Sequence, residues 1–126
     1  MALDLGSVDK AELNLRAVSD LVGCRVENYD GVRLGSLTEI VVDLDRAEVA
    51  YAVFTRVSLG VETSYPIPWS LLAVGRDRVV IDVDPVALRH TEGYDAVDSS
   101  LFEDESWAKR VHAWYGLHPY WNRSVI

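Results

Sequence analysis

Two pairs of aspartates have a spacing that metal sites use. Asp43 and Asp45 are separated by one residue, as are Asp82 and Asp84, which places both carboxylates of a pair on one face of a strand. A hard cation such as Ca²⁺ needs about six to eight converging oxygens, and the sequence contains no glycine-centred calcium loop. We therefore interpret these acids as solvated turn residues and expect no bound metal.

The other residues with chemical potential form no recognised catalytic or zinc-binding pattern. His90, His112 and His118 lie in different predicted elements and show no i,i+4 pairing, the spacing that puts two zinc ligands on one helix face. Cys24 is the only cysteine, which excludes an internal disulfide, and its place beside Gly23 is typical of a small buried thiol. No serine lies in a Gly-x-Ser-x-Gly turn, and no phosphate-binding glycine loop is present. We expect no enzyme activity and no cofactor.

The charge balance limits the partners of this acidic chain. Its 12 basic and 20 acidic residues give a formal net charge of −8, which disfavours direct binding to nucleic acid or to an anionic membrane surface. Residues 1–6 lack the basic start and apolar core of a signal peptide, and no apolar run approaches the ~20 residues of a membrane-spanning helix. The sequence predicts a soluble, cytoplasmic protein without membrane insertion.

The elements that would position any site are mainly β. Asp30-Gly31 is flanked by β-formers and predicts a hairpin with a type I′ turn. The segment from Val32 to Leu44 changes the parity of its apolar residues, which predicts a strand bent through a bulge near Gly35. The segment from Val49 to Phe54 is apolar on both parities, so we expect both of its faces to be covered.

The later β-segments predict the closure of the sheet. Pro66 and Pro68 cannot donate to a ladder, so this stretch should leave the sheet or lie at its edge, with Trp69 following as a largely buried lid. The segment from Val79 to Val83 alternates as a closing strand does, and Asp84-Pro85 caps and starts a short helix.

The C-terminal stretch predicts an aromatic helix. Ser100 to Glu103 has the spacing of a capping box, and Gly116 is positioned to end the helix. A stripe of large apolar residues follows one helix face, and further aromatic residues come after the predicted helix end. Left in water, this surface would be unfavourable, so we expect it to form an interface made of Trp107, Val111, Trp114, Tyr115, Tyr120 and Trp121.

Four short motifs stand in an order and spacing that a known domain family shares: Leu21-x-Gly23, Asp30-Gly31-x-x-x-Gly35, Val42-Asp43-Leu44-Asp45 and Ile67-Pro68-Trp69. In these motifs the chain resembles the PRC-barrel domain family, whose relatives include the cytoplasmic part of a photosynthetic reaction-centre subunit and the C-terminal barrel of a ribosome-maturation factor. The resemblance implies a small, strongly bent β-barrel over about Val18 to His90. We expect an N-terminal arm (1–17), a PRC-barrel domain (18–91), and a linker with an aromatic helical tail (92–126).

The resemblance also implies a non-catalytic docking and assembly module. We expect self-association, most simply as a homodimer, because two-fold dimers are the commonest soluble assembly. The alternative for the aromatic tail is that it folds back over its own barrel. The alternative function is a regulator that binds a ribosomal or other basic protein, for which the net charge of −8 is suitable, or a small ligand.

Overall fold

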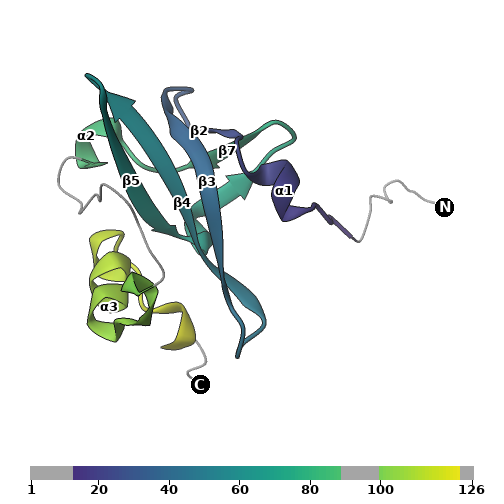
Figure 1. The fold of residues 1–126 in the computed structure, drawn as a ribbon, viewed down its shortest axis with the longest axis vertical. Helices are drawn as coiled ribbons and strands as arrows, with labels where there is room; N and C mark the ends of the chain where they lie inside the picture. The colour runs from purple at the N-terminus through teal and green to yellow at the C-terminus, as the bar shows by residue number, and fades with distance from the viewer. Residues whose placement is uncertain (1–12, 89–99, 123–126) are drawn as a thin grey trace.

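The computed structural model describes residues 13–88 and 100–122, and six strands of this part form one sheet (Figure 1). The strand order is β5-β4-β3-β2-β7-β6, so β5 and β6 are the two ends of the sheet. In chain order the elements are α1 (Val18–Leu21), β2 (Arg25–Glu27), β3 (Arg33–Asp43), β4 (Glu48–Ser58), β5 (Val61–Pro68), η1 (Trp69–Leu71), β6 (Leu72–Val74), β7 (Arg78–Ile81), α2 (Pro85–Leu88), η2 (Leu101–Glu103), α3 (Glu105–Trp114) and η3 (Tyr120–Asn122).

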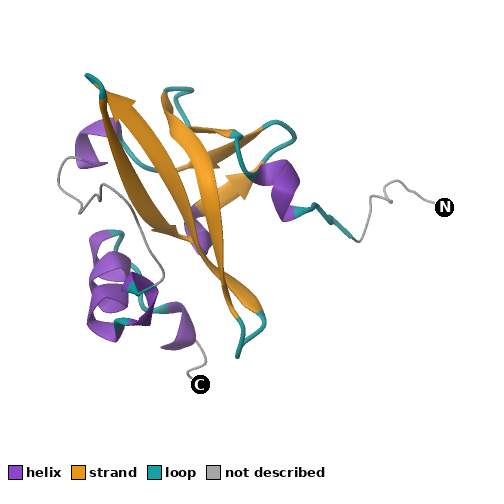
Figure 2. Ribbon diagram, in the orientation of Figure 1, coloured by secondary structure: helices purple, strands orange, loops and turns teal. Residues whose placement is uncertain are grey.

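The sheet curls into a half-barrel, which confirms the predicted mainly β, strongly bent fold (Figure 2). All neighbouring strands are antiparallel except β2 and β7, which run parallel with Val26 opposite Val79. This pairing joins the start of the sheet to its last strand. None of the helices in the described part of the chain is long and apolar enough to cross a membrane.

The bend in β3 comes from three irregularities in its pairing. The β2–β3 register shifts opposite Gly35, and the β3–β4 register shifts between Leu37 and Glu39 and again at Val41. A Cβ atom on Gly35 would lie 2.3 Å from the carbonyl oxygen of Thr55. The predicted bulge near Gly35 is therefore confirmed, and glycine allows β4 to approach β3 this closely.

The first hairpin differs from the predicted type I′ turn. In that turn Asp30 would have a positive φ, but among the described non-glycine residues only Ala47 and Leu59 do. Instead, the Gly31 amide donates to the Asn28 carbonyl at 3.0 Å, and Gly31 has a φ of +82°. The buried Asn28 side chain accepts from the backbone amides of Asp30 and Val32. This side chain replaces part of the backbone pairing, as asparagine does in many turns.

The two faces of β4 meet two different cores. Ala52 and Phe54 point into the half-barrel, where Leu34, Leu37 and Ile67 pack around them. Ala50 and Tyr51 belong to a second cluster on the outer side of the sheet. The prediction that both faces of the segment from Val49 to Phe54 are covered is therefore confirmed. Burial on both faces explains why this strand is apolar on both parities.

Two prolines lie at the end of the edge strand β5. Pro66 pairs with Val53 and Pro68 with Tyr51, so the predicted edge position is confirmed. Proline fits here because an edge strand needs ladder donors on one side only. Trp69 follows in η1 as the predicted lid, with most of its surface buried against the half-barrel core.

The tail helix begins later than predicted. Residues 101–103 form the turn η2, and α3 starts at Glu105, with Asp104 rather than Ser100 as its N-cap. The Asp104 carboxylate accepts from the Ser106 hydroxyl and from the backbone amides of Trp107 and Ser106. These bonds, the one from the hydroxyl most of all, lower the pKa of Asp104 because they stabilise its charged form. At the other end, Gly116 has a φ of +71° and ends the helix, as predicted.

Candidate functional site: an aromatic cleft between the sheet and the tail

Helix α3 covers the outer side of β4 through an aromatic cluster. Trp107 and Val111 are 0% exposed and pack on Ala50 and Tyr51. The Tyr51 ring lies at the centre of the cluster, 5.3 Å from the Trp107 ring. Figure 1 shows α3 lying beside the strands β4 and β5. We call the segment from Leu101 to Asn122 the tail.

The six residues expected at an interface therefore lie together, but on their own sheet. Trp107 and Val111 have no surface left for a partner in this arrangement. The remaining four are partly buried against the same cluster and keep some exposed surface: Trp114, Tyr115, Tyr120 and Trp121. The sequence allowed the tail to pack on a neighbouring subunit or on its own barrel. In this structure the tail packs on its own half-barrel.

A hydrogen bond fixes the end of the tail to the β3–β4 hairpin. The Tyr120 hydroxyl donates to Asp43 Oδ2 at 2.5 Å, and the same carboxylate accepts from the Arg46 amide and guanidinium. The bond from Tyr120 is the main reason that the pKa of Asp43 is lowered. Burial, and then the bond to Asp43, raise the pKa of Tyr120 to about 12. Asp43 thus has a structural role in place of its predicted solvated state.

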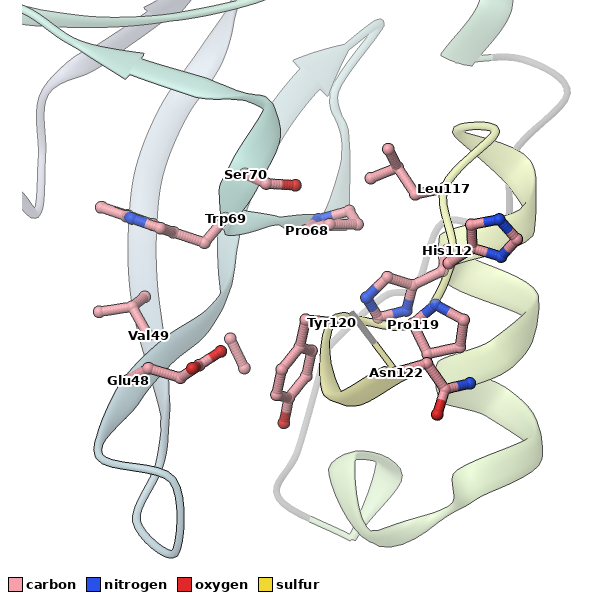
Figure 3. Close-up of a pocket in the computed structure, with 12 residues that line it drawn as sticks. Glu48, Val49, Pro68, Trp69, Ser70, His112, Leu117, Pro119, Tyr120 and Asn122 are labelled. Carbon is pink, nitrogen blue, oxygen red and sulfur yellow. The ribbon is translucent and has the colours of Figure 1, made fainter. Parts of the chain in front are cut away.

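A cavity of about 630 Å³ opens between the sheet and the tail. In Figure 3 the side chains of Pro68, Trp69 and Glu48 come from the sheet side, and those of Tyr120 and His112 come from the tail. Volumes of about 300–1,000 Å³ are typical of small-molecule sites. We call this space the tail cleft. Its further lining residues are Val49, Ala50, Ser70, Leu117, His118, Pro119 and Asn122.

One residue that lines the tail cleft, His112, has a buried polar atom without a partner among the described residues. His112 is 1% exposed, and its Nδ1 lies 2.8 Å from the carbonyl oxygen of Ala108. Its Nε2 has no hydrogen-bond partner among the described residues. The Tyr51 hydroxyl is likewise buried and unpartnered within the described part of the chain, and burial raises its pKa. Buried polar groups are normally satisfied, so these two atoms are notable.

The other candidate ligands and nucleophiles do not come together. In the part of the chain that the structure describes, no three His, Cys, Asp or Glu residues are grouped to hold a metal ion. Asp84 accepts from the amide of Val86 and so caps α2, as predicted. Cys24 is partly buried, and its thiol lies 3.6 Å from the Asp20 carbonyl. His90 lies outside the described residues, and His118 is exposed at the cleft.

A second surface feature was not predicted. Leu59, at the tip of the β4–β5 hairpin, is 100% exposed and has a φ of +53°. Val57 and Val61, on either side of the tip, are also exposed. The sequence signal was present in Val57-Ser58-Leu59-Gly60-Val61, but its register was not fixed before the pairing of Ser58 with Val61 was known.

The chain belongs to the PRC-barrel domain family, because the family model matches residues 14–88. This confirms the resemblance drawn from the sequence motifs. A comparison with curated proteins finds no match. PRC-barrel domains mediate protein interactions and are generally non-catalytic, so the family indicates an interaction or assembly module. The tail lies beyond the matched residues, whereas the sheet side of the cleft, formed by residues 48–50 and 68–70, lies within them.

Proposed function

We propose that this protein is a non-catalytic assembly module that self-associates as a homodimer through the tip of the β4–β5 hairpin. Family membership supports the general role, since PRC-barrel domains mediate protein interactions. The choice of the hairpin tip as the contact surface rests on Leu59, which is fully exposed and has a left-handed backbone conformation. The tail contributes to the fold of each subunit, and its partly exposed aromatic residues stay a secondary candidate contact.

Leu59 is unfavourable at its position in two independent ways. Leu59 and Gly60 both have positive φ in a two-residue hairpin loop, the arrangement that selects Asn, Asp or Gly at the first position. A left-handed conformation costs a branched side chain about 1–2 kcal/mol. The exposed leucine also gains nothing from burial in the monomer. Such local violations concentrate at functional sites, and contact with a second subunit would offset both costs.

The surroundings of the tip are suited to a second copy of the same chain. Val57 and Val61 are 65% and 59% exposed and flank Leu59 on opposite faces of the hairpin, because Val57 pairs with Glu62 and Val61 pairs with Ser58. A two-fold axis through the tip would bring Leu59 of one copy against Leu59 of the other and bury both side chains.

Sedimentation equilibrium of the wild type and of Leu59→Asn tests this proposal. Asparagine tolerates the left-handed conformation, so the variant should unfold at the same denaturant concentration or higher. We expect a dimer mass for the wild type at tens of micromolar and at least tenfold weaker association for the variant. Leu44→Asn is the matched control, because Leu44 is 86% exposed at the tip of the β3–β4 hairpin. It should keep the dimer mass.

Two results would contradict the proposal. A monomer mass for the wild type at tens of micromolar removes self-association. A dimer that survives Leu59→Asn unchanged, with both variants folded by circular dichroism, assigns the contact to another surface.

A further inference from the structure

We propose that the tail cleft is a binding site for a small aromatic molecule that carries an N–H or O–H donor and no negative charge. The donor would bond to His112 Nε2 while the aromatic body lies against Tyr120, Pro68 and Pro119. This goes beyond the proposed assembly role and does not depend on it. The cleft and the β4–β5 hairpin tip share no residue.

The hydrogen-bonding state of His112 determines what the cleft recognises. The Ala108 carbonyl can only accept, so the contact of 2.8 Å places the proton of the neutral ring on Nδ1. Nε2 then presents a lone pair, and no described residue donates to it. Burying an acceptor without a hydrogen bond makes the free energy of folding less favourable. A ligand donor would satisfy it, and a ligand acceptor would not.

The walls of the cleft favour a flat apolar body. Tyr120 supplies an aromatic ring, and Pro68 and Pro119 supply apolar ring surfaces, whereas the Trp69 ring points away from the tail (Figure 3). Aromatic rings pack well against such surfaces in stacked or edge-to-face arrangements. Tyr120 is held in place by its bond to Asp43, and the His112 ring meets it at 5.8 Å. These contacts hold the Tyr120 ring in place, while the buried Nε2 has to be uncovered when a ligand enters.

The charges around the cleft disfavour an anion. Glu48 is the acidic side chain among the described lining residues, and none of those residues is Lys or Arg. The Asp43 carboxylate lies next to Tyr120 and is paired with the Arg46 guanidinium. The formal net charge of the whole chain is −8. A carboxylate or phosphate ligand would therefore be repelled both at the cleft and at a distance. A neutral or cationic molecule would not.

Three probes on the wild-type protein test the assignment by isothermal titration calorimetry. Indole provides the aromatic body and the N–H donor, 1-methylindole lacks only the donor, and indole-3-acetate adds a negative charge. We expect indole to bind in the cleft, and each of the other two to bind about tenfold more weakly. Chemical-shift changes of the backbone amides of Trp69 and His112 should locate the binding.

His112→Phe and Tyr51→Phe form a matched pair of variants. Each removes a buried polar atom that has no partner among the described residues, but only His112 lines the cleft. We expect His112→Phe to bind indole about tenfold more weakly and 1-methylindole as the wild type does. Tyr51→Phe should bind indole with unchanged affinity. A purely structural His112 would instead alter stability and leave the ratio of indole to 1-methylindole affinity as it is in the wild type.

The proposal is overturned if the wild type binds indole and 1-methylindole equally, or binds none of the probes at millimolar concentration. Preferential binding of indole-3-acetate overturns the charge assignment. Should His112→Phe fail to fold, the comparison of probes on the wild type still decides. Sedimentation of the same samples separates this proposal from the assembly role, because loss of the dimer leaves indole binding unchanged and loss of indole binding leaves the dimer unchanged.

Discussion

Tyr120 donates its hydroxyl to Asp43 across 77 residues of sequence, at a distance of 2.5 Å. Asp43 is the last residue of β3, and Tyr120 opens the last described turn of the tail. The bond therefore connects the sheet that the family shares to a segment beyond the family match. It also holds one wall of the tail cleft in place.

Removing this hydroxyl should loosen the tail without unfolding the sheet. We expect Tyr120→Phe to lower the melting temperature by about 5 °C, because a hydrogen bond to a charged acceptor is lost while the ring remains. Differential scanning calorimetry measures the change. Tyr29→Phe is the control, since Tyr29 is 66% exposed and makes no such bond in the described part of the chain. Equal melting temperatures for Tyr120→Phe and the wild type would show that the bond does not stabilise the fold.

The same pair predicts how stability depends on pH. The pKa of Asp43 is lowered in the folded state, so its contribution is present above the ordinary value of 3.8 and is lost as the pH falls below it. The pKa of Tyr120 is raised from 10.0 to about 12, so its contribution is present below pH 10.0 and is lost as the pH rises toward 12. Denaturation of the wild type and Tyr120→Phe across the pH range should give curves that converge at both extremes. Parallel curves would contradict the linkage.

Trp107 should be the most important residue of the tail for stability. It is 0% exposed and contacts the rings of Tyr51 and Phe102. Truncating a buried tryptophan costs about 3–5 kcal/mol, so we expect Trp107→Ala to lose that much of its free energy of unfolding in urea. Trp121→Ala is the matched control and should cost less, because Trp121 is partly exposed. A larger loss for Trp121→Ala would place the main tail contact elsewhere.

Gly35 should not accept any side chain. A Cβ atom there would lie 2.3 Å from the Thr55 carbonyl oxygen and 3.0 Å from the Phe54 ring, and backbone atoms cannot move aside cheaply. We expect Gly35→Ala to destabilise the protein by about 1–3 kcal/mol or more, as overpacking does. Ser36→Ala in the next position should stay within about 0.5 kcal/mol of the wild type. Urea denaturation that ranks the two variants the other way would refute the close strand approach.

Asp104 should set the start of α3. Its carboxylate accepts from the amides of Ser106 and Trp107, which would otherwise have no intrahelical partner. Asp104→Ala should lower the melting temperature, and Asp104→Asn should recover most of the loss because asparagine is an equally good N-cap. Ser100→Ala should have the smaller effect. The reverse order would restore Ser100 as the cap that the sequence predicted.

The fold was predictable where local patterns and tertiary packing agree. The parity change in β3 required a bend, and the prolines at 66 and 68 required an edge. The apolar residues of the segment from Val49 to Phe54 predicted that both of its faces are buried, but they do not identify the residues that pack on them. Intramolecular and intermolecular contacts bury the same apolar surface, so the location of Trp107 on its own sheet was not decidable from the pattern.

The unpredicted features depend on competition between similar local signals. Ser100 and Asp104 are both good caps, and the packing of Trp107 on Tyr51 favours the later start. At the first hairpin, the Asn28 side chain supplies acceptors that a turn assignment based on Asp30-Gly31 leaves out. The tail cleft could not be predicted from the sequence, because it forms only when the tail packs on the sheet. For the same reason the sequence does not show which ring nitrogen of His112 lacks a hydrogen-bond partner.

The parallel pairing of Val26 with Val79 has a consequence for the order in which the protein folds. In a chain synthesised from its N-terminus, β2 can pair with β3 early, because the two are separated by a short turn. Its other edge stays open until β7 has been made, since contacts distant in sequence form late and slowly. Through that interval β2 is an unprotected edge, and unpaired edges are where nascent chains associate wrongly. Closure by β7 should therefore be the slow step of refolding, and the stage at which the chain is most prone to aggregate.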